Sequence, residues 1–258
     1  MAELPLRIPM KLERDTIVRA KFELRFEPGH PKEAIFGIVY QIVLEKFPGM
    51  THTLLPPSRR PEELKTNNEL FKYLPLNELN GNGLSIGVGP QVVSINIEKP
   101  YIGWLNWKPQ LMDILNSLCD SHIIKNVERT SLDYHNFIED DVFTLTKKAV
   151  EIIYFNIKPK KTGIRMELSE EGYIEVLNFI DKAAPDIKYK KDKKDVNEQT
   201  KKGSIIDIEI FREKIIGNRE FKTNLESILD ISHTLKNKLF FSILSDDYVK
   251  NDLGATFS

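Results

Sequence analysis

The chain has 258 residues, of which 41% are hydrophobic and 29% charged, and this composition excludes an intrinsically disordered protein. Its 37 basic and 38 acidic residues leave a formal net charge of −1, which argues against a general nucleic-acid coat protein but leaves room for a local basic patch. The single cysteine, Cys119, excludes an intrachain disulfide and a zinc site built from cysteines.

The location of the protein is indicated by what its first residues and its apolar stretches lack. Residues 1–10 have no basic region followed by an apolar run, so we expect no signal peptide. No stretch approaches 18 consecutive apolar residues, so we expect no membrane association. Together with the unpaired cysteine, these features favour a cytoplasmic protein.

Regular hydrophobic spacing predicts a strand and then a helix near the start of the chain. Over residues 17–26 apolar and charged side chains alternate, which is typical of a half-buried strand. Over residues 34–47, Ile35, Val39 and Ile42 recur at helical spacing, and Pro48-Gly49 then ends the helix.

The middle of the chain is expected to form a loop, a hairpin and a second helix. The proline-rich residues 50–70 are typical of a surface loop, and residues 71–76 are expected to form a short strand. Residues 84–97 alternate on both sides of Gly89-Pro90, which predicts a β-hairpin. A helix is expected over residues 109–118, with Pro109 in its first turn.

The remaining residues predict a run of strands closed by a long helix over residues 220–244, whose apolar stripe needs a sheet or helix to cover it. The connections between these strands are too short for helical crossovers, so their pairing should be antiparallel. The expected strands are residues 127–138, 152–157, 163–168, 173–179 and 204–211.

This order of elements predicts an α+β protein. We expect two packed halves, each a mainly antiparallel sheet covered by helices. The acidic break at residues 139–141 is the expected boundary, which divides the chain into an N-terminal α+β half, 1–140, and a C-terminal half, 141–258, of an antiparallel sheet and a long helix.

Several sequence blocks are distinctive. They are Glu23-Leu24-Arg25-Phe26-Glu27-Pro28, Val88-Gly89-Pro90-Gln91-Val92-Val93-Ser94-Ile95-Asn96, Pro100-Tyr101-Ile102-Gly103-Trp104, Arg129 with Leu132, Tyr134 and Asn136, and Leu229-Asp230-Ile231-Ser232-His233. They resemble a sporadically distributed, uncharacterised family of prokaryotic proteins with E-I-R-F-x-P, V-G-P-x-x-x-S-V-N, P-Y-x-G-W and L-D-x-A-H blocks. Asp133 departs from the pattern, since a basic residue is common there.

The resemblance covers nearly the whole chain, and its middle block is the most specific part. It implies no reaction that could be transferred to this protein. The patchy distribution of the family implies an association with mobile-element or antiviral-defence gene clusters.

The densest aromatic cluster is the first candidate binding site. Tyr101, Trp104 and Trp107 could anchor a partner protein or stack on a nucleobase. The alternative is a packed corner between the hairpin and the helix that follows, because aromatic side chains often stabilise such joints.

A lysine-rich segment is the second candidate, with a solvated loop as the alternative interpretation. Acidic residues interrupt it and it contains no arginine, which removes bidentate recognition of phosphate. The residues that could contact nucleic acid are Lys188, Lys190, Lys191, Lys193 and Lys194.

Other polar groups have weaker functional interpretations beside structural ones. Cys119 and His122 are spaced so that their side chains could meet, and a Gly87-x-Gly89 sequence superficially resembles a phosphate loop, but packing and a hairpin turn are expected instead. His233 is expected to be packed and hydrogen-bonded. Two further pairs would form a metal or acid–base site only if their strands were neighbours, and are expected to be solvated: Asp133 with His135, and Asp207 with Glu209.

The sequence therefore assigns no catalytic, cofactor-binding or metal-binding residue. We expect a non-catalytic accessory protein that binds another protein, as a hetero-complex or as a homodimer. Nucleic-acid binding through the lysine-rich segment, and an enzyme of unknown type, remain alternatives.

Overall fold

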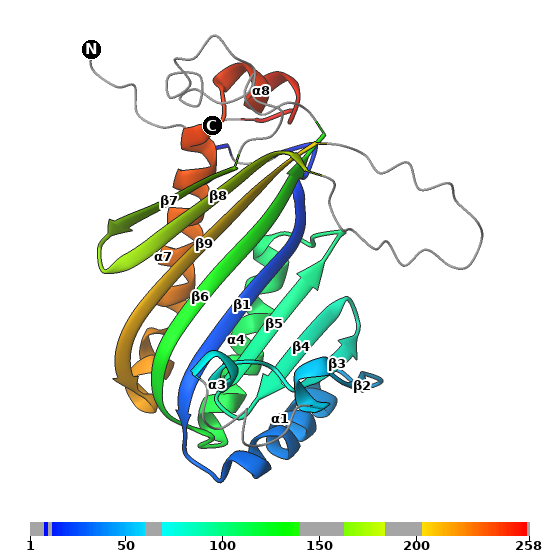
Figure 1. The fold of residues 1–258 in the computed structure, drawn as a ribbon, viewed down its shortest axis with the longest axis vertical. Helices are drawn as coiled ribbons and strands as arrows, with labels where there is room; N and C mark the ends of the chain where they lie inside the picture. The colour runs from blue at the N-terminus through cyan, green and yellow to red at the C-terminus, as the bar shows by residue number, and fades with distance from the viewer. Residues whose placement is uncertain (1–7, 10–11, 60–68, 140–162, 184–202, 257–258) are drawn as a thin grey trace, which may run out of the picture.

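The chain forms one large antiparallel sheet. The structure is a computed structural model that describes residues 8–9, 12–59, 69–139, 163–183 and 203–256. Nine strands lie in the order β2-β3-β4-β5-β1-β6-β9-β8-β7 (Figure 1). Their bounds are β1 (Ile17–Pro28), β2 (Thr51–Leu54), β3 (Asn77–Gly81), β4 (Leu84–Gly89), β5 (Val92–Glu98), β6 (Ile124–Ile138), β7 (Gly163–Glu170), β8 (Tyr173–Ala183) and β9 (Gly203–Gly217).

The α+β class is confirmed, but the expectation of two separate sheets is wrong. β6 pairs with β1 on one side and with β9 on the other, so strands from both parts of the chain share one sheet. An unpaired strand edge leaves backbone donors and acceptors unsatisfied, and β6 and β9, each 15 residues long, satisfy one another along most of their length. Whether residues 1–140 and 141–258 fold as separate units stays a prediction.

Three helices cover one face of the sheet, behind it in Figure 1: α1 (Lys32–Lys46), α4 (Trp104–Asp120) and α7 (Asn218–Ile243). The even-numbered side chains of β1, such as Phe22 and Leu24, are buried under them. Three shorter helices are η1 (Pro56–Arg59), α3 (Glu69–Lys72) and α8 (Asp246–Asn251). No helix in the described ranges is both long and apolar enough to cross a membrane.

The long helix α7 contributes to two clusters of buried hydrophobic residues. Phe221 and Leu225 belong to the larger cluster with α1 and α4, whereas Leu239 belongs to a second one with β8 and β9. Buried polar residues, Ser232 and Lys236, lie near the junction of these two stretches of α7. The core is therefore interrupted by polar groups.

Several local expectations need correction. The segment 50–70 is not all loop, because it holds β2 and η1. The side chains of β2 are exposed, so the sequence of this strand lacks the alternating hydrophobic pattern. Pairing with β3 determines its structure instead. Residues 71–76 are not a strand: α3 ends within them and β3 follows at Asn77. α4 begins earlier than expected, so Pro109 lies in its second turn.

Other expectations agree with the structure. The hairpin of β4 and β5 turns at Pro90, as expected from the Gly87-x-Gly89-Pro90 sequence. The helix α7 and the strands of the second part of the chain lie where hydrophobic spacing places them, whereas α8 was not anticipated. The expected strand 152–157 lies outside the described residues.

Two glycines give a matched test of backbone packing. A Cβ added to Gly29 would lie 2.2 Å from the carbonyl oxygen of His122, whereas a Cβ on Gly37 in α1 meets nothing within 4 Å. We expect Gly29→Ala to lower the free energy of unfolding by ~2 kcal/mol, because backbone must move to relieve the overlap. Gly37→Ala should raise it by ~0.5–1 kcal/mol, since alanine favours the helix. Urea denaturation followed by circular dichroism measures both; equal effects would contradict the close approach at Gly29.

Candidate functional site

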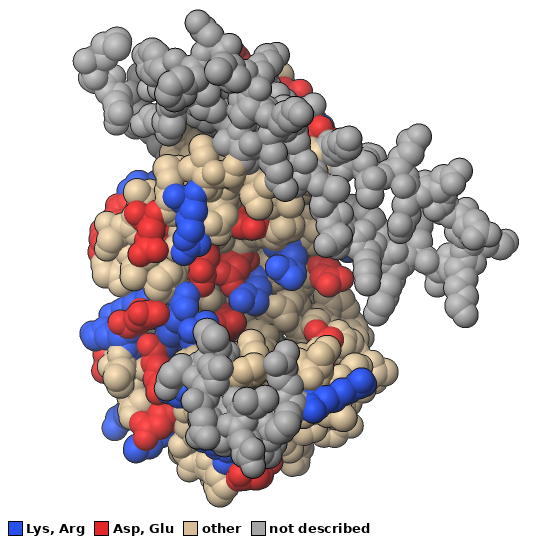
Figure 2. Space-filling view, viewed as in Figure 1, with Lys and Arg blue, Asp and Glu red and all other residues tan. Residues whose placement is uncertain are grey.

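Charged side chains gather on the face of the sheet opposite α1, α4 and α7. Successive side chains of a strand point to opposite faces, so the odd-numbered residues of β1 and β6 lie together on this side. Figure 2 shows basic and acidic side chains mixed over its centre. We call the following residues the charged face: Lys21, Glu23, Arg25, Arg129, Ser131, Asp133 and Glu209.

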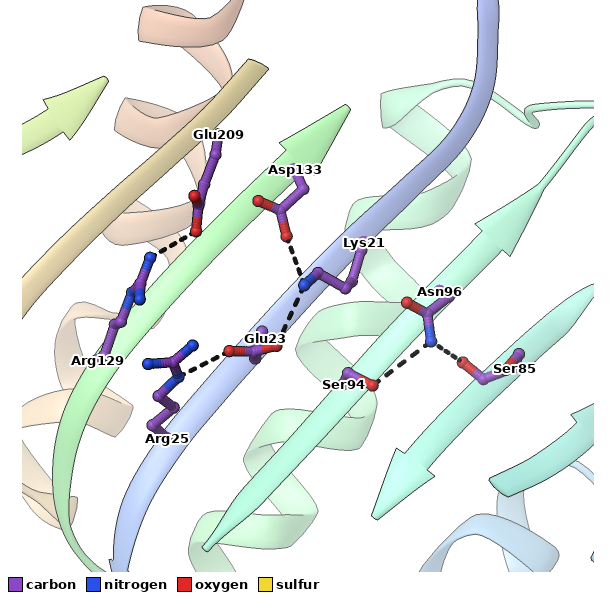
Figure 3. A network of polar contacts seen from close by, with 9 residues as sticks. All are labelled: Lys21, Glu23, Arg25, Ser85, Ser94, Asn96, Arg129, Asp133 and Glu209. Carbon is purple, nitrogen blue, oxygen red and sulfur yellow. Dashed lines mark hydrogen bonds and ion pairs between the residues drawn. The ribbon is translucent and has the colours of Figure 1, made fainter. Parts of the chain in front are cut away.

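Ion pairs connect these side chains across three strands (Figure 3). Nζ of Lys21 lies 3.1 Å from Oε2 of Glu23 and 3.0 Å from Oδ2 of Asp133. Arg25 donates from Nε to Oε1 of Glu23 over 2.8 Å. Arg129 of β6 donates from Nη2 to Oε1 of Glu209 over 2.5 Å, which links β6 to β9.

The protonation of the charged face follows from burial and from these neighbours. Burial raises the pKa of Asp133 to about 6, although Lys21 opposes the shift. Burial also acts against ionisation of Glu23, but Lys21 and Arg25 outweigh it and lower the pKa of that carboxyl. Burial favours the neutral amine of Lys21, yet the two carboxylates prevail and raise its pKa. Lys21 therefore stays protonated at neutral pH and does not serve as a nucleophile.

Two neighbouring side chains of β6 on this face each hold a buried polar atom without a hydrogen bond in the described part of the chain. They are Nε of Arg129 and Oγ of Ser131. The next side chain of β6 on this face, Asp133, is paired through Oδ2 with Nζ of Lys21 at 3.0 Å. A buried polar atom left unpaired costs ~1–3 kcal/mol, so two of them side by side mark a site where an external group could bind.

The segment that follows α3 closes one end of the charged face. The hydroxyl of Tyr73 donates to Oε2 of Glu128 over 2.5 Å, and the guanidinium of Arg25 lies 4.8 Å from the centre of the Tyr73 ring. A Cβ on Gly87 of β4 would lie 3.1 Å from side-chain atoms of Pro75, so this segment packs closely on the sheet. The charged face is thus bounded by chain at this end.

The predicted aromatic block forms a packed joint on the other face of the sheet. Trp107 is fully buried, whereas Tyr101 and Trp104 are half-buried. The hydroxyls of Tyr101 and Tyr134 are 3.1 Å apart, and Trp104 stacks on His233 with ring centres 4.3 Å apart. We call these five residues the aromatic joint. His233 is packed as expected, but by stacking, and no hydrogen bond to its ring is found in the described residues.

The joint brings together residues from separate distinctive sequence blocks. The exposed apolar area beside it belongs to its chain neighbours, since Leu105 is 87% exposed and Ile102 38%. A role of Tyr101, Trp104 and Trp107 in partner binding stays a prediction.

A buried lysine against the joint was missed by the sequence analysis. Lys236 of α7 is 7% exposed, and its Nζ lies 4.1 Å from the centre of the Tyr134 ring. Burial lowers the pKa of Lys236 to about 7, against the attraction of Asp15. Burial, Lys236 and Lys108 also lower the pKa of His233 to about 3, so this ring is neutral. The sequence does contain an indication that Lys236 is buried, because it follows Leu229 by seven residues and so lies on the apolar stripe of the helix.

The condition under which the pairs Asp133 with His135 and Asp207 with Glu209 could come together is met, because β6 and β9 are neighbouring strands. Asp133 lies opposite Glu209, and His135 lies opposite Asp207 and contacts its carboxylate through Nδ1. His135 and Asp207 are therefore paired with each other, whereas Asp133 pairs with Lys21 and Glu209 pairs with Arg129. Across the described ranges, no group of three or more histidine, cysteine, aspartate or glutamate residues is placed to hold a metal ion.

The remaining candidates are a thiol and the lysine-rich segment. Cys119 is buried, and burial raises the pKa of its thiol to about 12, so it is not a thiolate at neutral pH. In the described part of the chain, the hydrogen bond between His122 and Cys119 runs through the backbone, from the N–H of His122 to the carbonyl of Cys119. The lysines at 188, 190, 191, 193 and 194 lie outside the described residues, and their contact with nucleic acid stays a prediction.

Comparison with known proteins adds no relationship: no family model and no curated protein matches this chain. The resemblance of the distinctive sequence blocks stays a prediction.

Proposed function

We propose that the chain is a non-catalytic accessory protein that binds another protein through its charged face. The observation that carries the proposal is the pair of buried atoms without a hydrogen bond in the described chain, Nε of Arg129 and Oγ of Ser131, on successive side chains of β6 on this face. Side chains two residues apart on a strand are separated by ~6.6 Å, which is also the repeat of a second extended chain. An extended segment of a partner laid along β6 could supply its backbone donors and acceptors to successive side chains.

The balance of charge on this face favours a protein partner over a nucleic acid. Lys21, Arg25 and Arg129 each contact at least one carboxylate of the same face. Phosphate binding depends on basic groups that are available to neutralise the backbone. A polyanion would have to displace these internal carboxylates, whereas a protein segment of mixed charge can join the network without doing so.

As part of this proposal, we infer the kind of partner from the family resemblance. A protein associated with antiviral-defence or mobile-element gene clusters is expected to act with the products of adjacent genes, here in the cytoplasm. Association with a second copy of the chain is the other form that this function could take.

Ser131→Ala provides the sharpest test of the proposal. The hydroxyl has no hydrogen bond to lose within the described chain, so the free energy of unfolding should stay the same or rise slightly. Binding of the partner should weaken about 10-fold, because one hydrogen bond of ~1.4 kcal/mol is lost. The measurement is titration of the purified protein with each adjacent gene product and with itself.

A matched control lies on the helical side of the molecule. The hydroxyl of Ser117 in α4 donates to the carbonyl of Asp113, so Ser117→Ala should leave the affinity unchanged. If neither an adjacent gene product nor a second copy binds the wild-type chain, the proposal fails. If a partner binds Ser131→Ala as tightly as wild type, the charged face is not the interface.

A further inference from the structure

We propose that Lys236 is a reactive amine that forms an imine with a small carbonyl compound at the aromatic joint. This site is independent of the proposed protein interface, since it lies on the opposite face of the sheet. The proposal stands on the placement of this buried amine against the Tyr134 ring of the aromatic joint, without an ion-pair or hydrogen-bond partner in the described residues.

The surroundings of Lys236 contrast with those of other lysines. Lys238, two residues further along α7, pairs with Glu170 at 2.5 Å, and Lys108 lies 2.9 Å from both Glu226 and Asp230. For Lys236 the described contact is the face of the Tyr134 ring. The carboxylate that acts on it electrostatically is Asp15, just before β1.

The groups around the amine allow it to lose its proton near neutral pH. Burial favours the uncharged form of Lys236, while Asp15 and the Tyr134 ring favour the ammonium. Burial raises the pKa values of Tyr101 and Tyr134, so both phenols stay protonated. His233, on the same helix, is neutral. A nucleophilic amine therefore lies 4.1 Å from the centre of the Tyr134 ring, whose neutral hydroxyl is 3.1 Å from that of Tyr101.

These groups match the needs of a carbonyl compound. The uncharged nitrogen attacks the carbonyl carbon, the oxygen takes up a proton, and a carbinolamine forms. Loss of water, with a proton leaving the nitrogen, then gives the imine; no electrons are gained or lost. A protonated phenol such as that of Tyr101 can donate a hydrogen bond to the carbonyl oxygen, and the indole of Trp104 offers apolar contact to the body of the ligand.

Part of the aromatic joint reaches the surface of the protein. Tyr101, Trp104 and His233 are half-buried, and Asp15 is exposed at the end from which β1 starts. The residue that follows Trp104, Leu105, projects into solvent. We therefore expect entry past these half-buried rings.

The test is reductive trapping of the folded wild-type protein with acetaldehyde and sodium cyanoborohydride at pH 7. The hydride adds to the imine carbon, the nitrogen takes a proton from water, and a stable secondary amine marks the lysine, which peptide mass spectrometry locates. Lys238 is the internal reference, because it is exposed and Glu170 raises its pKa. We expect Lys236 to be modified at least ~10-fold faster than Lys238, since about half of its amine is uncharged at this pH.

The pH profile and the unfolded chain complete the test. The rate at Lys236 should rise with pH and level off above ~8, while the rate at Lys238 keeps rising. In urea the two rates should become equal, because the difference depends on the fold. Modification of folded Lys236 no faster than Lys238 at pH 7 would overturn the proposal, and so would a rate that climbs in parallel with that of Lys238.

Discussion

Lys236→Met should give a more stable protein, by about 3 kcal/mol in the free energy of unfolding at pH 7. Burial lowers the pKa of the amine from 10.5 to about 7, and each pKa unit corresponds to ~1.4 kcal/mol. The gain in stability expected from this pKa shift is reduced, because the substitution also removes the attraction between the ammonium and the Tyr134 ring, worth ~1–2 kcal/mol. Methionine has a similar length and adapts its shape, so the packing should be kept. Thermal and urea denaturation measure the difference.

The pH dependence of this difference separates burial of charge from packing. The folded protein binds the proton of Lys236 less tightly than the unfolded chain, so the destabilisation is complete below pH ~7. It should fade as the pH rises towards 10.5. The advantage of Lys236→Met should shrink over that interval, and an advantage that is constant from pH 7 to 10.5 would assign it to packing. Lys238→Met, at an exposed position, should change little at any pH.

The second large effect is expected at the centre of the charged face. Lys21→Met should lower the free energy of unfolding by ~2–4 kcal/mol at pH 7, because it leaves Asp133 without its cation in a half-buried site. Arg25 still compensates Glu23. Adding Asp133→Asn should restore much of the loss, since the amide carries no charge. Urea denaturation of both variants measures the coupling.

Lowering the pH should also restore stability in Lys21→Met. The pKa of Asp133 is already raised to about 6, and removal of Lys21 raises it further, so the folded protein takes up this proton more readily than the unfolded chain. The deficit should therefore be smaller at pH 5 than at pH 7. Lys125→Met, which removes a cation from an exposed pair with Glu27, is the control and should have almost no effect. A deficit independent of pH would show that lost packing, and not the Asp133 charge, is responsible.

Both effects bear on function because each concerns a group whose charged form burial destabilises, the amine of Lys236 and the carboxyl of Asp133. Proteins keep destabilising polar groups mainly where activity or recognition needs them. The unpaired atoms at Arg129 and Ser131, the buried carboxyl of Asp133 and the buried amine of Lys236 are such groups. They lie on opposite faces of one sheet, and their tests do not depend on one another.

Hydrophobic spacing was sufficient to predict most long elements of this chain. The alternation over residues 17–26 predicts β1, and the recurring apolar residues after Glu220 predict α7, because a side chain's face depends only on its position along its own element. Exposed or short elements such as β2 and α3 were missed, since nothing in their own residues distinguishes them from a loop.

The arrangement of elements and the chemistry of both sites depended on contacts distant in sequence. Pairing of β6 with β9 joined the two expected sheets into one and placed Arg129 beside Glu209. The sequence could not predict this pairing, because the hydrophobic pattern of a strand is the same whichever strand lies next to it. Lys236 carries an ordinary side chain on an amphipathic helix, and only the rings of Tyr134 and its neighbours make it a buried amine. Periodicity specifies which way a side chain faces, whereas its charge state depends on every group that the fold brings against it.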